Sequence, residues 1–194
     1  ILLVFLGTII LVTQINLLTG FLSILTVFLY VLVYTPLKKI TWLNTPIGSI
    51  PGALPPMGGW AAATGHLEPG AWIIFAIMFL WQHPHFYAIA WMCKDDYARA
   101  NFKMLPVIEP DGKRTIRQIF WHLTLLVPVS VLLYVEGSSG MIYVVGVIIL
   151  TSLFLLSALP LAKGKSVEGA KLLLKSSVIY LPLLLILIIV DKVL

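Results

Sequence analysis

Two adjacent carboxylates, Asp95 and Asp96, stand at the end of a long apolar run, and cations follow them at Arg99 and Lys103. In proteins Mg²⁺ is commonly bound by one or two carboxylates together with substrate phosphate oxygens. These residue types therefore predict a site for a divalent metal carrying an anionic group such as a diphosphate, with Asp95 and Asp96 as the metal ligands. The plainer alternative is that the charges only mark the water-facing boundary of a membrane span.

Two histidines, His83 and His85, precede the carboxylates within the apolar run. If residues 81–106 form one helix, with a rise of about 1.5 Å per residue, His85 lies roughly 16 Å beneath Asp96. The alternative for both imidazoles is hydrogen-bonded packing, and Pro84 between them is expected to kink the helix because it removes a backbone donor. Steps of i+3 and i+4 predict one helix face, the wall of a pocket, made of His85, Ala88, Met92, Asp96 and Arg99.

The composition determines what kind of chain must position these residues. Of 194 residues, 60% are hydrophobic and only 11% are charged, which is typical of an integral membrane protein. The single cysteine, Cys93, excludes an internal disulfide framework and a multi-cysteine metal site. The chain starts without methionine, and its first run lacks the basic region of a signal peptide. We therefore expect it to be part of a longer protein.

The apolar runs predict an all-α fold, a polytopic transmembrane helix bundle that forms a single membrane-embedded domain over residues 1–194. Residues 1–37 carry no charge and suit two spans of about 18 residues each. A third span, 47–63, is rich in glycine and proline, so we expect it to bend against the bundle interior, either for substrate contact or for close helix packing alone. The polar stretch 94–118 is longer than a simple connection between two helices, so we expect it to have a functional role. Four further spans are predicted at 71–91, 120–135, 141–161 and 178–190, the last with an upstream turn, which makes about seven.

The basic residues predict the orientation of the bundle. Twelve of the thirteen Lys and Arg residues follow the second, fourth and sixth spans. By the positive-inside rule this side, with the Asp95 and Asp96 mouth, faces the cytoplasm of a bacterial plasma membrane, or the matrix if the membrane is the mitochondrial inner membrane. Attraction to anionic lipid headgroups accounts for most of the cations, and no nucleic acid partner is expected.

Three stretches, YTPLKKITWLNTPIG, PGALPPMGGWAA and WQHPHFYAIAWMCKDDYARANFKMLPV, resemble the protohaem IX farnesyltransferase (haem O synthase) family of membrane prenyltransferases. The resemblance covers nearly the whole chain, and the HPHF segment is specific to this branch of the superfamily. It implies a nine-helix bundle, of which the spans here are the third to the ninth. It also implies transfer of a farnesyl group from farnesyl diphosphate to a vinyl group of haem B, with addition of water, to give haem O for haem-copper oxidase biogenesis.

The resemblance further implies Mg²⁺ bound by two aspartate-rich loops, which polarise the diphosphate so that an allylic cation forms in a pocket shielded from water. The family's first loop would precede this chain. In its second motif the sibling enzymes place another aspartate about one helical turn earlier, where this chain has Trp91 and Met92. Asp96, which is followed by Tyr97, matches the family's Asp-Tyr pair.

We therefore expect Asp96, Asp95 and Arg99 to be the catalytic residues. His85, with His83 second, is expected to face the haem, since haem iron can take an axial histidine. The partners implied are farnesyl diphosphate, haem B, the lipid bilayer, and haem A synthase or an oxidase assembly factor. The candidate diphosphate partners are Arg99, Lys103, Lys38 and Lys39, and Asn44 is a further candidate substrate-binding residue.

Two other classes of function remain open from the residues alone. One is a different polyprenyl transferase with an aromatic acceptor, which the two histidines disfavour. The other is a non-catalytic haem-binding membrane protein or a small-solute transporter, in which intramembrane histidines and charges at the mouth serve binding only. Dependence on a bound metal and on diphosphate would separate the enzymes from the binding proteins.

Overall fold

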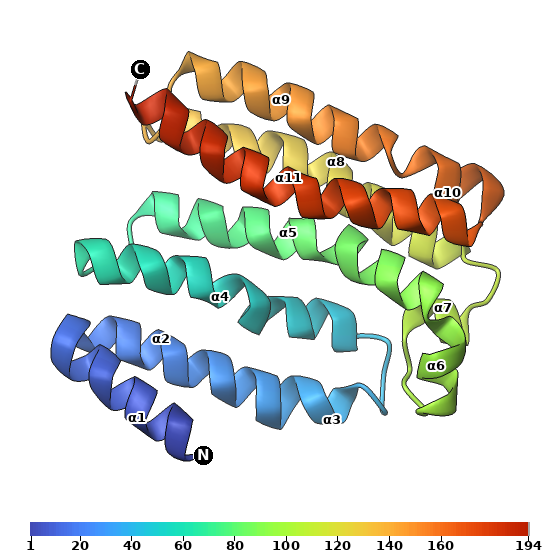
Figure 1. Ribbon diagram of the computed structural model, residues 1–194, viewed down its shortest axis with the longest axis horizontal. Coiled ribbons are helices and arrows are strands. Elements are labelled where there is room, and N and C mark those ends of the chain that lie inside the picture. Colours follow the sequence, from blue (N-terminus) through green and yellow to red (C-terminus); the bar gives the residue numbers. More distant parts are fainter. Residues whose placement is uncertain (194) are drawn as a thin grey trace.

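The computed structural model describes residues 1–193, and all regular secondary structure in this range is helical (Figure 1). Five helical runs are long and apolar enough to cross a membrane: 17–37, 69–92, 113–135, 141–164 and 167–193. The predicted all-α, polytopic bundle is therefore confirmed. The elements are α1 (Leu2–Ile10), η1 (Leu11–Ile15), α2 (Leu17–Phe28), η2 (Leu29–Tyr34), α3 (Thr35–Leu37), α4 (Asn44–Thr64), α5 (Pro69–Met92), α6 (Lys94–Arg99), α7 (Leu105–Ile108), α8 (Lys113–Val135), α9 (Met141–Leu156), α10 (Leu159–Gly164) and α11 (Val167–Val193), of which η1 and η2 are π-helical.

Helix α4 is the predicted third span, although it starts at Asn44 and is not among the five apolar runs. Its prolines, glycines and polar residues reduce its hydropathy, yet it packs against α2 on one side and α5 on the other (Figure 1). Three prolines, Pro51, Pro55 and Pro56, lie inside it without ending it. Such residues are tolerated in a membrane helix where neighbouring helices surround the backbone. The packing expected of this segment is therefore present.

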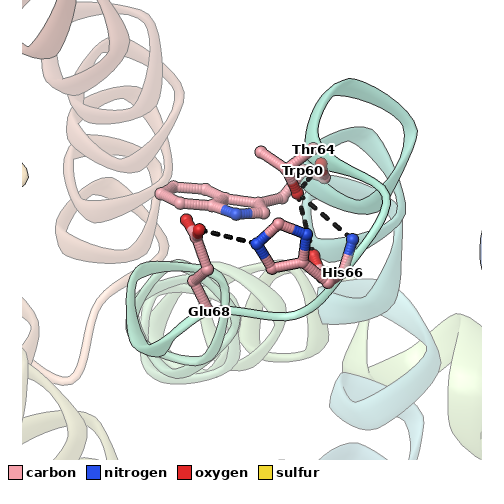
Figure 2. Close-up of polar contacts among 4 residues, drawn as sticks. All are labelled: Trp60, Thr64, His66 and Glu68. Atoms are coloured by element: carbon pink, nitrogen blue, oxygen red, sulfur yellow. Dashed lines mark hydrogen bonds and ion pairs between the residues drawn. The ribbon is translucent and has the colours of Figure 1, made fainter.

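A tight turn reverses the chain between α4 and α5 (Figure 2). Gly65 ends α4 with a φ of +80°, a conformation that glycine adopts at little cost. The Thr64 hydroxyl lies 3.0 Å from the Trp60 carbonyl and 2.9 Å from that of His66. His66 Nε2 lies 2.8 Å from a Glu68 carboxylate oxygen. These contacts close the turn, so α5 runs back antiparallel to α4.

Helix α5 is the centre of the bundle and packs against α4, α8 and α11. It is also the most buried of the five candidate spans. Its polar residues divide among these neighbours. Gln82 donates to the Ser49 carbonyl on α4 at 3.3 Å, and His83 stacks on His122 of α8. The residues of the His-Pro-His segment therefore face different helices.

The prediction of one continuous helix face from His85 to Arg99 is wrong. Helix α5 ends at Met92, and Cys93 has φ −105° and ψ 23°, outside the helical region. The physical reason lies further along the chain, where the Lys103 amide donates to the Lys38 carbonyl at 2.7 Å. That bond requires the chain to leave the axis of α5 and fold back over the loop before α4. Helix α6 is thus a separate short helix.

The predicted boundary of the last span is also wrong, because α11 begins at Val167 with no turn before residue 178. Its first part carries Lys171 and Lys175, which are exposed, while Leu173 and Ser177 are buried. The lysines lie on one face of a continuous helix and do not mark a turn. Helix α8 likewise starts before residue 120, and the sixth predicted span divides into α9 and α10.

The C-terminal helices α8, α9 and α11 are joined by polar contacts. The Tyr143 hydroxyl on α9 donates to the Ser130 carbonyl on α8 at 2.9 Å. Asp191 of α11 accepts from the backbone amides of Gly140 and Tyr143, the latter at 2.9 Å. A carboxylate from one helix thus caps the N-terminus of another, where the free amides favour negative charge.

Candidate functional site

Three connections rich in basic residues meet at one end of the bundle, on the side of α3, α6 and α10 (Figure 1). Besides the backbone bond between Lys103 and Lys38, the Asn44 side chain donates to the Lys103 carbonyl at 3.1 Å. The Lys165 ammonium donates to the Asp111 carbonyl at 2.5 Å. The connections after the second, fourth and sixth predicted spans therefore form one continuous surface.

A cavity of about 210 Å³ opens beneath this surface. Its walls are mostly apolar, and its few polar groups come from tyrosines, Thr45 and Gln82. An apolar cavity with a few convergent polar groups is the usual form of a small-molecule site. The residues around it are Tyr30 and Tyr34 of η2; Thr45, Gly48, Pro51 and Gly52 of α4; Gln82, Phe86 and Ile89 of α5; and Tyr97 and Met104.

Lys38 is the predicted cation that the fold brings to the cavity. Its ammonium lies 4.4 Å from the ring centroid of Tyr34 and 5.7 Å from that of Tyr30. Ring faces attract a cation electrostatically at these distances. Since both tyrosines line the cavity, the positive charge is held at its edge. Lys39 and Lys103 are exposed.

The predicted acidic pair lies on α6, where both carboxylates are exposed. Asp96 is bonded to the Arg99 guanidinium one turn later, and Tyr97 on the same helix lines the cavity. Burial raises the pKa of Tyr97 above its usual range, so its hydroxyl stays protonated and can donate. Asp95, Asp96 and Arg99 are thus near the cavity mouth but outside its wall.

The donor set at this mouth suits a cation that takes most of its ligands from elsewhere. Among residues 1–193, no group of three or more His, Cys, Asp and Glu side chains could hold a metal ion by itself. Two neighbouring carboxylates are nevertheless what Mg²⁺ needs when phosphate oxygens and water complete its shell. The residues present therefore fit a metal that arrives with a diphosphate.

Asn44 has a different role from the one expected. It is completely buried, and its amide nitrogen donates to the carbonyls of Thr41 at 2.6 Å and Lys103 at 3.1 Å. Both amide hydrogens of Asn44 are therefore used in hydrogen bonds to backbone carbonyls of the two loops. Asn44 holds the Lys103 segment over the start of α4 and does not present a donor to a ligand.

His85 is on α5, faces α11 and is half-buried. Its Nδ1 is 2.8 Å from the Ser177 hydroxyl, and the Trp81 indole donates to the Ser177 carbonyl at 2.9 Å. The rings of His85 and Trp81 stack with centroids 5.0 Å apart. The hydrogen-bond partner of His85 is thus on the last helix.

His83 is completely buried against α8. Its Nδ1 lies 2.7 Å from the Phe79 carbonyl, and its ring stacks on His122 at a centroid separation of 3.7 Å. Its Nε2 is sealed and has no hydrogen-bond partner in the described structure. This environment is that of a packing residue, and the cavity does not reach it. Sequence reasoning missed His122, the only other histidine within a predicted span.

Sequence reasoning also missed most of the residues around the cavity. One signal was available, because Tyr30, Tyr34 and Lys38 recur at intervals of four and so share one helix face. Thr45 and Gln82 carried no such pattern. They come together only because α4 and α5 pack side by side.

Comparison with known proteins gives consistent results. The sequence pattern of the UbiA prenyltransferase family matches residues 1–179. The protoheme IX farnesyltransferase of Solibacter usitatus is 46% identical over 178 residues, which are 92% of this chain and 61% of that protein. That of Salinibacter ruber is 49% identical over 162 residues, 84% of this chain and 57% of the relative. This chain thus spans less than two thirds of the length of these relatives.

A solved structure supports the fold. It comes from work on digeranylgeranylglyceryl phosphate synthase in membranes and superposes with a TM-score of 0.80 at 21% identity. The match covers 98% of this chain and 66% of the other. At that identity the likeness concerns the arrangement of helices alone.

Proposed function

This chain belongs to the UbiA prenyltransferase family, and we propose that it carries most of the catalytic bundle of a protohaem IX farnesyltransferase. The reaction would join the farnesyl group of farnesyl diphosphate to a vinyl group of haem B and add water, giving haem O. Support comes from relatives 46% and 49% identical to this chain that carry this enzyme's name. The activity is proposed for the whole protein, of which these residues form a part.

The observation that carries the proposal is the position of Lys38 over the tyrosines of the cavity. An allylic diphosphate has an anionic head and an apolar tail. The ammonium at the edge and the apolar walls beneath it match these two parts in the same order. Arg99 adds a planar guanidinium at the mouth, which can contact phosphate oxygens through two parallel hydrogen bonds.

Asp95 and Asp96 would hold the divalent metal, which we propose to be Mg²⁺. When bound, the metal neutralises the charge that develops on the departing diphosphate. Arg99 is bonded to Asp96, so its guanidinium is held beside the carboxylates that would bind the metal. The rings of Tyr30 and Tyr34, which already attract an ammonium, are suited to stabilise an allylic cation in the cavity.

The acceptor must meet this cation from within the membrane. Haem is too large and apolar for the charged mouth, so we place it below the mouth, at the depth of His85. The basic end would face the cytoplasm of a bacterial plasma membrane, in line with the positive-inside rule. Haem O would then pass to haem A synthase or to an oxidase assembly factor in the same membrane.

The test is the variant Asp96→Asn in the full-length protein, with haem O measured by pigment extraction from cells. We expect loss of haem O with normal protein levels, because Asp96 is exposed and an amide there disturbs no packing. Arg99→Lys should also reduce haem O, since an ammonium cannot replace a bidentate guanidinium. Asp111→Asn, at another exposed aspartate of the same surface, serves as the control. Near-normal haem O from Asp96→Asn would leave the carboxylates with a boundary role only.

A further inference from the structure

We propose that His85 binds the iron of the haem through Nε2, and that Ser177 is the positioning residue that makes this mode possible. The inference rests on the proposed function, because it concerns the acceptor of that reaction. It assigns a role to a residue of the last helix, far from the charged mouth in sequence.

The position of the His85 proton follows from the hydrogen bonds of Ser177. The Ser177 hydroxyl donates its only proton to the Leu174 carbonyl, at 2.6 Å. Its oxygen must then accept at the 2.8 Å contact with His85 Nδ1. Nδ1 therefore carries the proton, and in neutral His85 Nε2 bears a free lone pair.

The imidazole is also fixed in orientation. Trp81 lies one turn before His85 on α5, and its indole donates to the Ser177 carbonyl at 2.9 Å. The same Trp81 ring stacks on His85, with 23° between the ring planes. Ser177 thus holds the histidine through its side chain and the stacking partner through its backbone. Partners of this kind, bonded to the second ring nitrogen, commonly orient histidine ligands of metals.

The other histidine of the segment has the same tautomer but no access. His83 donates from Nδ1 to the Phe79 carbonyl, so its Nε2 is also a lone pair. That atom is sealed between α5 and α8, whereas Nε2 of His85 is unpartnered and is not among the sealed polar atoms of the described structure. Of the two histidines of this segment, His85 is therefore the one that can offer a lone pair to a ligand.

The lone pair decides which part of the haem is bound. An ionised propionate accepts hydrogen bonds, and neutral His85 has no proton left on Nε2 to donate. Iron requires an electron pair, and neutral imidazole is one of its usual axial ligands in proteins. The geometry therefore favours the iron over the propionates.

The experiment compares haem with metal-free protoporphyrin IX, which keeps both propionates and lacks the iron. Each is titrated into the purified full-length protein and followed by its absorbance. His85→Ala should weaken haem binding about tenfold or more, with loss of the histidine-ligated spectrum, and leave protoporphyrin IX binding unchanged. His85→Gln, which keeps a donor for Ser177 and most of the volume, should do the same if the alanine variant folds poorly. Equal loss for both porphyrins, or no loss for haem, overturns the proposal.

The role of Ser177 is tested separately. Ser177→Ala should weaken haem binding by about tenfold and alter the spectrum, while Ser177→Thr, which restores a hydroxyl, should recover both. Ser176→Ala, next to it on α11, is the control. A parental spectrum and affinity in Ser177→Ala would refute the positioning role.

Failure of this inference can be told from failure of the proposed function. If the parent protein forms haem O while His85→Ala retains full haem affinity, the enzyme stands and the iron contact falls. If the parent forms no haem O and binds neither porphyrin, both fall together.

Discussion

A methyl group added at Gly52 should disturb the cavity wall through Gln82. An ideal Cβ at Gly52 would lie 1.9 Å from the Gln82 side-chain oxygen and 2.9 Å from its amide carbon. The amide must therefore move. In the parent it donates to the Ser49 carbonyl of α4 at 3.3 Å and to the Met78 carbonyl at 3.0 Å. Gly52→Ala should break the bond between the two helices and push the amide along the cavity.

The magnitude follows from two opposing terms. Replacing a helical glycine by alanine favours the helix by about 1 kcal/mol. Leaving a buried amide without its partner costs about 1 to 3 kcal/mol. Gly58 lies on the same helix, and a Cβ there meets no atom within 4 Å, so Gly58→Ala keeps only the favourable term. Gly52→Ala should thus be less stable than Gly58→Ala by about 1 to 3 kcal/mol.

Thermal or SDS-induced unfolding of the detergent-solubilised full-length variants measures this difference. The affinity for the proposed substrate, farnesyl diphosphate, should also fall in Gly52→Ala and not in Gly58→Ala, because of these two glycines only Gly52 lines the cavity. Adding Gln82→Ala removes the obstructing amide, so Gly52→Ala should cost nothing in that background. Equal stability of the two alanine variants, or a cost that persists without Gln82, would refute the reasoning.

Two further substitutions test packing within the membrane by their effect on unfolding. Asp191→Ala should lower the free energy of unfolding by about 1 to 2 kcal/mol, because α9 loses the carboxylate that caps its first amides. An unchanged unfolding midpoint would contradict this role of Asp191. Tyr87→Phe should stabilise by about 1 kcal/mol, since the Tyr87 hydroxyl is sealed without a partner. Tyr143→Phe is its control and should destabilise, because that hydroxyl is bonded to Ser130; loss of stability in Tyr87→Phe would mean that its hydroxyl has a partner.

The apolar runs predicted the order of the long helices, because lipid requires each span to satisfy its own backbone. Of the seven expected spans, five are long and apolar enough to cross a membrane in the part of the chain that the structure describes. The errors lie where a helix has one polar side or where a distant contact ends it. Lys171 and Lys175 are exposed on α11, and in the sequence their charges resemble those of a connection between two spans. Nothing at Cys93 announces a break, since neither proline nor glycine follows it; the bond between Lys103 and Lys38 depends on tertiary structure.

The candidate site was predictable where charge revealed it and not where shape made it. Asp95, Asp96 and Lys38 could be selected because charges are rare in this chain. The residues of the apolar walls could not be selected, since an apolar side chain such as Phe86 has the same character in the cavity wall as in any other part of a membrane helix. Asn44 shows the opposite error, in which a polar side chain in a basic loop serves the loop itself.

The central position of α5 has a consequence for how the chain enters the membrane during synthesis. This helix has the lowest hydropathy of the five candidate spans. Helix α4, which precedes it, is not among the helices that are long and apolar enough to cross a membrane. Insertion of a helix into lipid depends on its apolar content, and polar residues near its centre oppose it. We therefore expect α4 and α5 to leave the translocon together as a hairpin, with Gln82 already covered by α4, and to remain beside it until α8 and α11 emerge.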